Sequence, residues 1–211
     1  MTDRVSDSNG LRYLALGDSY TIGEGVQSEE KWPYILTDNL ERAGFNMDYP
    51  QIIARTGWTT GDLKLAIDQT PLRGQFDLVS LLIGVNNQYR GVSRGYTIDD
   101  YRDELSELIQ EAIDFAGGYT GRVFVVSIPD YSVTPFVSDN DKSRVSSEID
   151  RYNAVKKEVA ESFNVKYFDI TPVSRLAADD LQLLASDGLH PSGKMYRMWV
   201  DLMIEDILKM L

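Results

Sequence analysis

Short apolar segments and longer amphipathic segments alternate along this chain. The short segments predict five strands, over residues 11–16, 48–54, 76–83, 122–128 and 165–170. The run over 76–83 is almost continuously apolar, which is typical of a strand buried on both faces of a sheet. The longer segments predict helices, over residues 31–43, 59–69, 98–115, 143–163 and 191–211.

This order of elements predicts an α/β fold, with a parallel sheet covered by helices on both faces. No internal repeat, low-complexity tract or linker divides the chain. We therefore predict one domain over residues 1–211, in which residues 1–10 are a flexible N-terminal extension. Parallel sheets bind ligands at the carboxyl ends of their strands, so functional residues are expected directly after the strands.

Composition and charge exclude several classes of function. The 211 residues carry 21 Lys and Arg against 33 Asp and Glu, a formal net charge of −12, so a nucleic-acid partner is not expected. The chain contains no Cys and one His, His190, which excludes disulfides, thiolate chemistry and multi-histidine metal sites. We predict neither a metal nor a cofactor.

The sequence also bears on membranes and compartment. Its first ten residues are polar, and no run approaches the roughly 20 apolar residues of a transmembrane helix. We therefore expect no membrane span and a cytoplasmic location. The acidic charge favours neutral or cationic partners at long range, and the oligomeric state is left open.

The first predicted strand leads into Gly17-Asp18-Ser19-Tyr20. A Ser on a sharp turn between a strand and a helix can expose its hydroxyl, while backbone N–H groups of the turn face an oxyanion beside it. Gly17 suits a tight turn because glycine tolerates positive φ. Asp-Ser after Gly is also ordinary turn chemistry, so these residues alone permit either interpretation.

A second segment, residues 186–191, contains Asp187 and His190. A seryl hydroxyl needs a base, and imidazole, with a free pKa of about 6.5, suits that task near neutral pH. Asp187 lies three residues earlier and can orient the imidazole through its other nitrogen. A lone His before a Pro can instead be a helix-entry residue without function.

Two further residues after predicted strands can donate hydrogen bonds to an oxyanion. Gly57 follows the second strand and precedes a helix, which can leave its N–H directed into the crevice. Asn86 follows the third strand, and its side-chain amide is a donor suited to a developing alkoxide. The structural alternatives are a helix cap at Thr56 and an Asx turn at Asn86 or Asn87.

Together these residues resemble the sequence blocks of the SGNH hydrolases, also called the GDSL-like esterase and lipase family. Gly17-Asp18-Ser19 resembles the first block, Gly57 the second, Gly84-Val85-Asn86-Asn87 the third and Asp187-Gly188-Leu189-His190 the last. The blocks are short, but their order and their positions after strands span most of the chain. Tyr20 and Asn87 depart from the pattern, since the family usually has an aliphatic residue and often an Asp there.

The resemblance implies a flavodoxin-like three-layer α/β/α fold and the hydrolysis of carboxylic esters through an acyl-serine intermediate. It makes Ser19 the nucleophile, His190 the base and then the acid, and Asp187 the residue that orients His190. The N–H groups of Ser19 and Gly57 and the amide of Asn86 would form the oxyanion hole.

The substrate is less constrained. Trp58, Tyr89, Tyr131 and Phe136 follow strands and are candidate substrate contacts, and residues 129–142 suggest a mobile flap. We expect small soluble esters, with a carbohydrate O-deacetylase, a lysophospholipase or a thioesterase as alternatives. A flavodoxin-like module that binds phosphate or flavin at residues 19–25 is the non-enzymatic alternative, and it has no need for the Asp187 and His190 pair.

Overall fold

A parallel sheet of five strands, in the order β2-β1-β3-β4-β5, forms the centre of the molecule. The computed structural model describes residues 10–211, with the backbone alone at residues 92–94. The strands are β1 (Tyr13–Gly17), β2 (Gln51–Ala54), β3 (Leu78–Leu82), β4 (Val123–Val126) and β5 (Lys166–Phe168). This confirms the predicted α/β fold. Of the predicted extension over residues 1–10, only Gly10 lies within the described residues.

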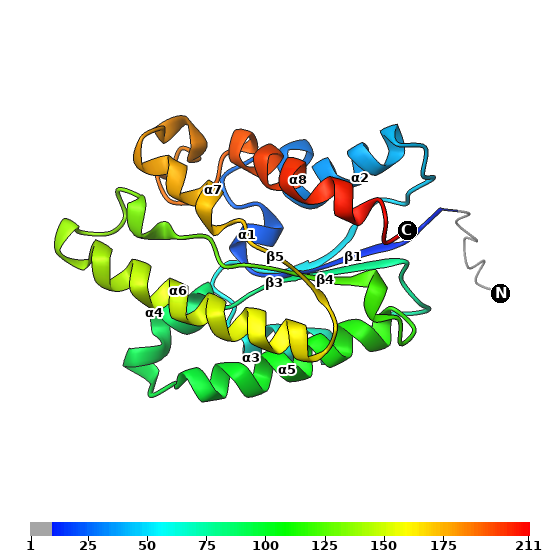
Figure 1. The fold of residues 1–211 in the computed structure, drawn as a ribbon, viewed down its shortest axis with the longest axis horizontal. Coiled ribbons are helices and arrows are strands. Elements are labelled where there is room, and N and C mark those ends of the chain that lie inside the picture. The colour runs from blue at the N-terminus through cyan, green and yellow to red at the C-terminus, as the bar shows by residue number, and fades with distance from the viewer. Residues whose placement is uncertain (1–9) are drawn as a thin grey trace.

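Helices cover both faces of the sheet (Figure 1). On one side lie α1 (Ser19–Ile22), α2 (Trp32–Arg42), α7 (Thr171–Arg175) and α8 (Gly193–Ile207), and on the other α3 (Thr60–Gln69), α4 (Val85–Arg94) and α5 (Ile98–Phe115). The long helix α6 (Asp139–Ser162) contributes side chains to the hydrophobic cores of both faces. The result is the three-layer arrangement of a doubly wound α/β fold.

Side chains of the central strands alternate between the two cores. Tyr13 and Ala15 of β1 belong to the core beneath α2 and α8, and Leu14 and Leu16 to the core beneath α3 and α5. Every residue of β1, β3 and β4 is buried, whereas the edge strands β2 and β5 are partly exposed. The continuous apolar runs therefore mark the centre of the sheet, as expected for strands covered on both faces.

Several helices differ from the sequence prediction, and the short helices α1 and α7 lie outside all the predicted helix ranges. Helix α4 has no counterpart among the predicted helices, because few of its residues are apolar and Asn86, Asn87 and Gly91 are weak helix formers. Helix α6 begins at Asp139, so the final residues of the predicted flap over 129–142 are helical. Earlier in that stretch a 3₁₀ turn (Tyr131–Val133) buries Tyr131 and Ser132. A flap over the whole stretch is therefore wrong, because much of it packs into the protein.

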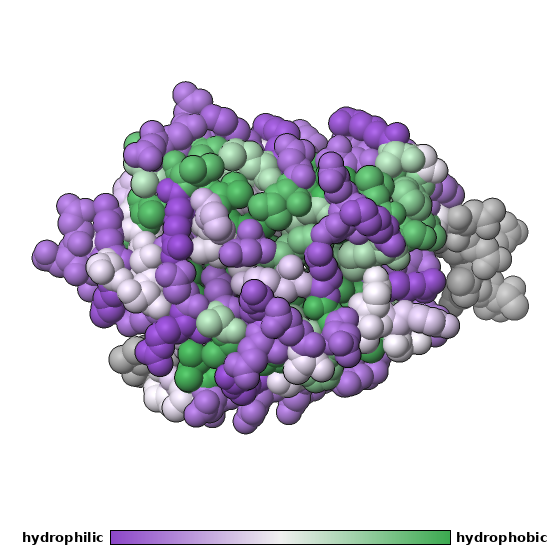
Figure 2. All heavy atoms as spheres, viewed as in Figure 1, coloured by the Kyte–Doolittle hydropathy of each residue, from purple (hydrophilic) through white to green (hydrophobic). Residues whose placement is uncertain are grey.

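The surface is largely polar. In Figure 2 hydrophilic residues cover most of the visible face, and hydrophobic residues show mainly over α7 and α8. Leu176 and Leu202 are among the exposed apolar side chains of these elements. Within residues 10–211, no helix is both long enough and apolar enough to cross a bilayer.

Candidate active site

The residues singled out from the sequence converge at the carboxyl end of the sheet. A cavity of about 140 Å³ is lined by Ser19, Gly57, Asn86 and His190, among others. The first three follow β1, β2 and β3 in turn, while His190 lies just before α8. A hydroxyl from the start of the chain and the single imidazole from its end thus face one cavity.

Ser19 is the first residue of α1, and close packing fixes the turn that presents it. A Cβ at Gly17 would lie 2.2 Å from Thr21 Oγ1 and 2.4 Å from the carbonyl oxygen of Leu82. Gly17 is not among the glycines with positive φ, so our sequence-based reason for a glycine there was wrong. Lack of space between β1, α1 and β3 requires it instead.

Asp18 caps helix α1, which begins at Ser19, from a fully buried position. Its Oδ1 accepts a hydrogen bond from the N–H of Tyr20 at 3.0 Å, while its Oδ2 has no partner among the described residues. Burial raises the pKa of Asp18 to about 7, although the hydrogen bond from Tyr20 and the positive charge of Lys156 both lower it. Lys156 of α6 is equally buried, and burial lowers its pKa to about 7. Two ionisable groups thus lie beneath the site without access to water.

A tight loop joins the predicted base to its carboxylate. Asp187 Oδ2 lies 2.6 Å from His190 Nδ1, and Asp187 Oδ1 accepts the backbone N–H groups of Leu189 and His190 at 2.9 and 3.0 Å. Partial burial raises the pKa of Asp187, but these hydrogen bonds outweigh it, so the net pKa lies below its usual value. The imidazole is held through Nδ1, which directs Nε2 away from the carboxylate.

Tyr20 contributes to the same arrangement. Its ring lies 5.6 Å from the imidazole of His190 and 6.4 Å from the ring of Trp199, measured between centroids. The aromatic residue at this departure from the family pattern therefore packs against the catalytic base candidate.

Of the two predicted oxyanion donors, Gly57 lies in the loop after β2 and Asn86 lies in the first turn of α4. Gly57 has φ +85°, a conformation that favours glycine, and a Cβ there would lie 2.6 Å from Nη2 of Arg90, at the end of a flexible side chain. Its N–H donates to none of the described residues. Asn86 Nδ2 donates one hydrogen to the carbonyl of Trp58 at 3.0 Å, which fixes the amide and leaves the second hydrogen available.

The second departure, Asn87, has a structural explanation. Its Oδ1 accepts the N–H of Thr60 at 3.1 Å, and its Nδ2 donates to Thr60 Oγ1 at 2.6 Å. The Thr60 hydroxyl donates in turn to Glu104. An Asp at position 87 would set two carboxylates against one hydroxyl hydrogen, so the neighbouring Glu104 makes the amide the better partner. Asn87 thereby ties the start of α4 to the start of α3.

Three of the four predicted aromatic contacts line the cavity. Tyr89, Tyr131 and Phe136 do so, and their ring centroids lie 6.0–6.3 Å from one another. Trp58 is not among the described residues that line the cavity, and its partly buried side chain packs against the core beneath α3 and α5. The structure instead gives the site the backbone carbonyl of Trp58, which holds Asn86.

Arg90 also lines the cavity, and the sequence analysis missed it. It lies one helical turn after Asn86, so both residues share a face of α4. That relation becomes visible only once α4 is known to be a helix.

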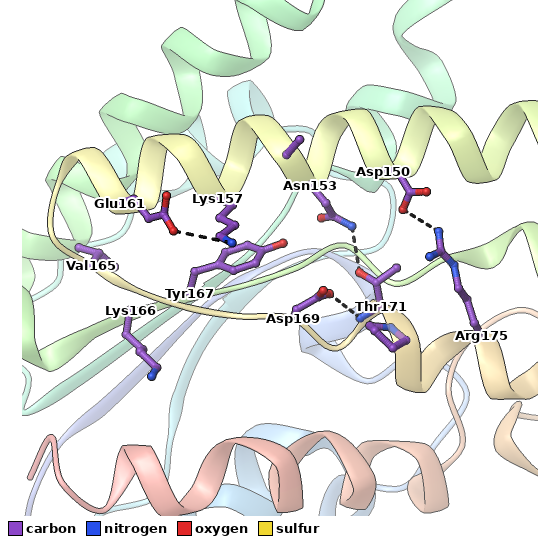
Figure 3. Close-up of a pocket in the computed structure, with 12 residues that line it drawn as sticks. Asp150, Asn153, Lys157, Glu161, Val165, Lys166, Tyr167, Asp169, Thr171 and Arg175 are labelled. Carbon is purple, nitrogen blue, oxygen red and sulfur yellow. Dashed lines mark hydrogen bonds and ion pairs between the residues drawn. The ribbon is translucent and has the colours of Figure 1, made fainter.

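A larger groove of about 630 Å³ lies between α6 and the edge strand β5 (Figure 3). Its polar side chains largely satisfy one another: Asp150 pairs with Arg175 at 2.6 Å, and Lys157 with Glu161 at 3.8 Å. It contains none of the residues predicted from the sequence. The candidate chemistry therefore resides in the smaller cavity.

Comparison with known proteins agrees with this location. A sequence model of the GDSL-like Lipase/Acylhydrolase family matches residues 15–198. An acetylxylan esterase of Geobacillus stearothermophilus is 25% identical over 159 residues, which are 68% of each chain. Two solved structures share the fold. The acetylxylan esterase Axe2 of G. stearothermophilus has a TM-score of 0.70 at 20% identity, covering 94% of both chains. The esterase EstA of Pseudoalteromonas sp. has a TM-score of 0.66 at 20% identity, covering 94% of this chain and 97% of that one.

Proposed function

Since the chain belongs to the GDSL-like lipase/acylhydrolase family and is therefore an esterase or acylhydrolase, we propose that it cleaves small carboxylic esters through an acyl-serine intermediate. The observation that carries the proposal is the shared cavity of Ser19 and His190, with Asp187 hydrogen-bonded to the far side of the imidazole. Membership of the family sets aside the non-enzymatic alternative, a module that binds phosphate or flavin.

In this mechanism Ser19 Oγ attacks the ester carbonyl while His190 Nε2 takes its proton. The negative charge on the carbonyl oxygen is met by the N–H groups of Ser19 and Gly57 and by the Asn86 amide. Collapse of the tetrahedral intermediate breaks the bond to the alcohol, which leaves with the proton from the imidazolium. Water, deprotonated by His190, then releases the acid from Ser19 by the same steps. Asp187 keeps the imidazole oriented and stabilises its charged form.

The size of the cavity supports a small acyl group. At about 140 Å³ it is well below the roughly 300–1,000 Å³ of pockets that enclose drug-sized ligands. An acetyl group fits this space, whereas a long acyl chain would have to extend beyond it. This favours short-chain esters over lysophospholipids.

A carbohydrate O-deacetylase is the second candidate. It is favoured by the similarity to an acetylxylan esterase and by the aromatic rings at the cavity mouth, since sugars commonly stack on aromatic faces. A thioesterase remains an alternative that the same machinery would serve. The cytoplasmic location expected from the sequence stays a prediction.

Covalent labelling tests the proposed mechanism. A fluorophosphonate should label the wild-type chain at Ser19, and Ser19→Ala should lose both the label and the hydrolysis of p-nitrophenyl acetate while its circular dichroism is unchanged. Ser28→Ala, at an exposed serine, is the matched control and should retain both. Turnover in the Ser19→Ala variant would overturn the covalent mechanism.

A further inference from the structure

A second groove opens directly beside the catalytic cavity. It has a volume of about 680 Å³ and shares Tyr89, Tyr131 and Phe136 with that cavity. Its remaining walls come from the end of the segment before α6 and from the first turns of α6, including Arg144 and Glu148. We refer to this space as the α4–α6 groove. A substrate too large for the catalytic cavity can extend into it without a change in the backbone.

The α4–α6 groove joins the catalytic cavity along Tyr89, Tyr131 and Phe136, and none of the described residues that line it belongs to the loop of His190. The segment that carries Tyr131 and Phe136 runs against the loop of His190, where Pro135 Cγ is 4.0 Å from the position of a Cβ on Gly188. Tyr131 also shares a small cavity with Leu189, the neighbour of the base. The catalytic cavity has room for a small acyl group, so the alcohol portion of a larger ester can extend from it into the α4–α6 groove.

Exposed aromatic rings form one wall of the groove. The relative exposure of Tyr89 is 56% and that of Phe136 is 53%, although the two rings contact each other. Large aromatic side chains usually bury most of their surface, so this pair offers an open apolar face to a ligand.

The opposite wall is a hydrogen-bonded network. Tyr131 donates to Gln88 Oε1 at 2.8 Å, and Gln88 Nε2 donates to Glu148 at 2.6 Å. Arg144 bridges Glu148 and Asp141, each at 3.0 Å. Two carboxylates against one guanidinium leave a net negative charge, which disfavours an anionic ligand such as a phospholipid headgroup or a nucleotide-bearing thioester.

We propose that the α4–α6 groove binds the alcohol portion of the substrate and that this portion is a neutral saccharide. An aromatic face beside a wall of charged donors and acceptors suits a ring with an apolar face and hydroxyls at its edge. The inference rests on the proposed esterase function and assigns the substrate class of that site.

Two acetyl esters with different alcohols test the assignment. Ethyl acetate is too small to reach the groove, whereas 1,2,3,4-tetra-O-acetyl-β-D-xylopyranose carries a sugar ring into it. The ratio of kcat/KM for the xylose ester to that for ethyl acetate should fall about tenfold in Phe136→Ala and in Arg144→Ala, through a higher KM for the xylose ester. Arg144 is an exposed helix residue, so its replacement keeps the test valid if Phe136→Ala fails to fold. Tyr49→Ala, at a highly exposed tyrosine outside the groove, should leave the ratio unchanged.

The outcomes separate the two proposals. An unchanged ratio in both groove variants would overturn the groove assignment while leaving the esterase function intact. A wild-type chain that hydrolyses neither ester and takes no fluorophosphonate would overturn the esterase function, and the groove assignment with it. A lower ratio in the groove variants alone supports the saccharide site.

Discussion

Replacing Asp18 by Asn tests the buried carboxyl that caps helix α1 in front of Ser19. Asn is as good a helix cap as Asp, and its Oδ1 can accept the N–H of Tyr20 as the carboxylate does. The substitution therefore keeps the cap and removes the ability to ionise, while an amide NH2 takes the place of Oδ2, which has no partner among the described residues. If burial disfavours the ionised form of Asp18, the free energy of unfolding of the variant should exceed that of the wild-type chain at every pH at which Asp18 is ionised in the unfolded chain.

The pH range follows from the two pKa values of Asp18. Its pKa is about 7 in the folded chain against an ordinary value of 3.8, so between these values the folded chain holds a proton that the unfolded chain has released. Because the folded state binds more protons, the wild-type stability should fall with rising pH by about 1.4 kcal/mol per pH unit. Over the whole range the contribution reaches about 4 kcal/mol. The Asn variant lacks this slope, so its advantage should grow from about pH 4 to pH 7 and then level off.

Urea unfolding followed by tryptophan fluorescence measures this difference, because Trp32 and Trp199 are fully buried. The free energies of unfolding of wild type and variant are compared at each pH unit from 4 to 8. Asp38→Asn, at an exposed aspartate paired with Arg42, is the control for removing one negative charge. A wild-type chain that is the more stable at pH 7–8 would refute the reasoning, since it would mean that Lys156 pairs with an ionised Asp18 strongly enough to offset burial.

Three further substitutions probe the site. Asp187→Asn should lower kcat/KM for p-nitrophenyl acetate about a hundredfold, with unchanged circular dichroism, because the imidazole loses its orienting carboxylate; full activity would show that the carboxylate is dispensable. Gly57→Ala should lower the free energy of urea unfolding by about 1–2 kcal/mol, because alanine is strained at φ +85° and contacts Arg90, and kcat should fall with it; equal stability would contradict the assigned conformation. Asn87→Asp should cost about 1–3 kcal/mol in the same unfolding measurement by placing a second carboxylate on Thr60 beside Glu104, and restoration in the Asn87→Asp, Glu104→Gln double variant would identify the cause.

The alternation of apolar runs and amphipathic segments along the sequence was sufficient to predict the class of fold. Burial on both faces of β1 and β3 demands continuous apolar residues, and that demand is visible without coordinates. Ser19, Asp187 and His190 could also be singled out as candidates, because few residue types can act as nucleophile, base and orienting acid and because their motifs occur in the order of a known family. Helix α4 was not predicted, since few of its residues are apolar and its two asparagines and its glycine are weak helix formers.

The tertiary structure decided which neighbours each residue meets. Position 17 requires glycine because α1 and β3 leave no space for a side chain, and not because of its backbone angles. Trp58 contributes to the site through its backbone carbonyl, which accepts a hydrogen bond from Asn86. The buried positions of Asp18 and Lys156, on β1–α1 and on α6, bring two ionisable groups under one site, although they are far apart in the sequence. Local sequence patterns report on burial and backbone preference within one element. Contacts between elements depend on how the layers pack, and packing is a property of the whole chain.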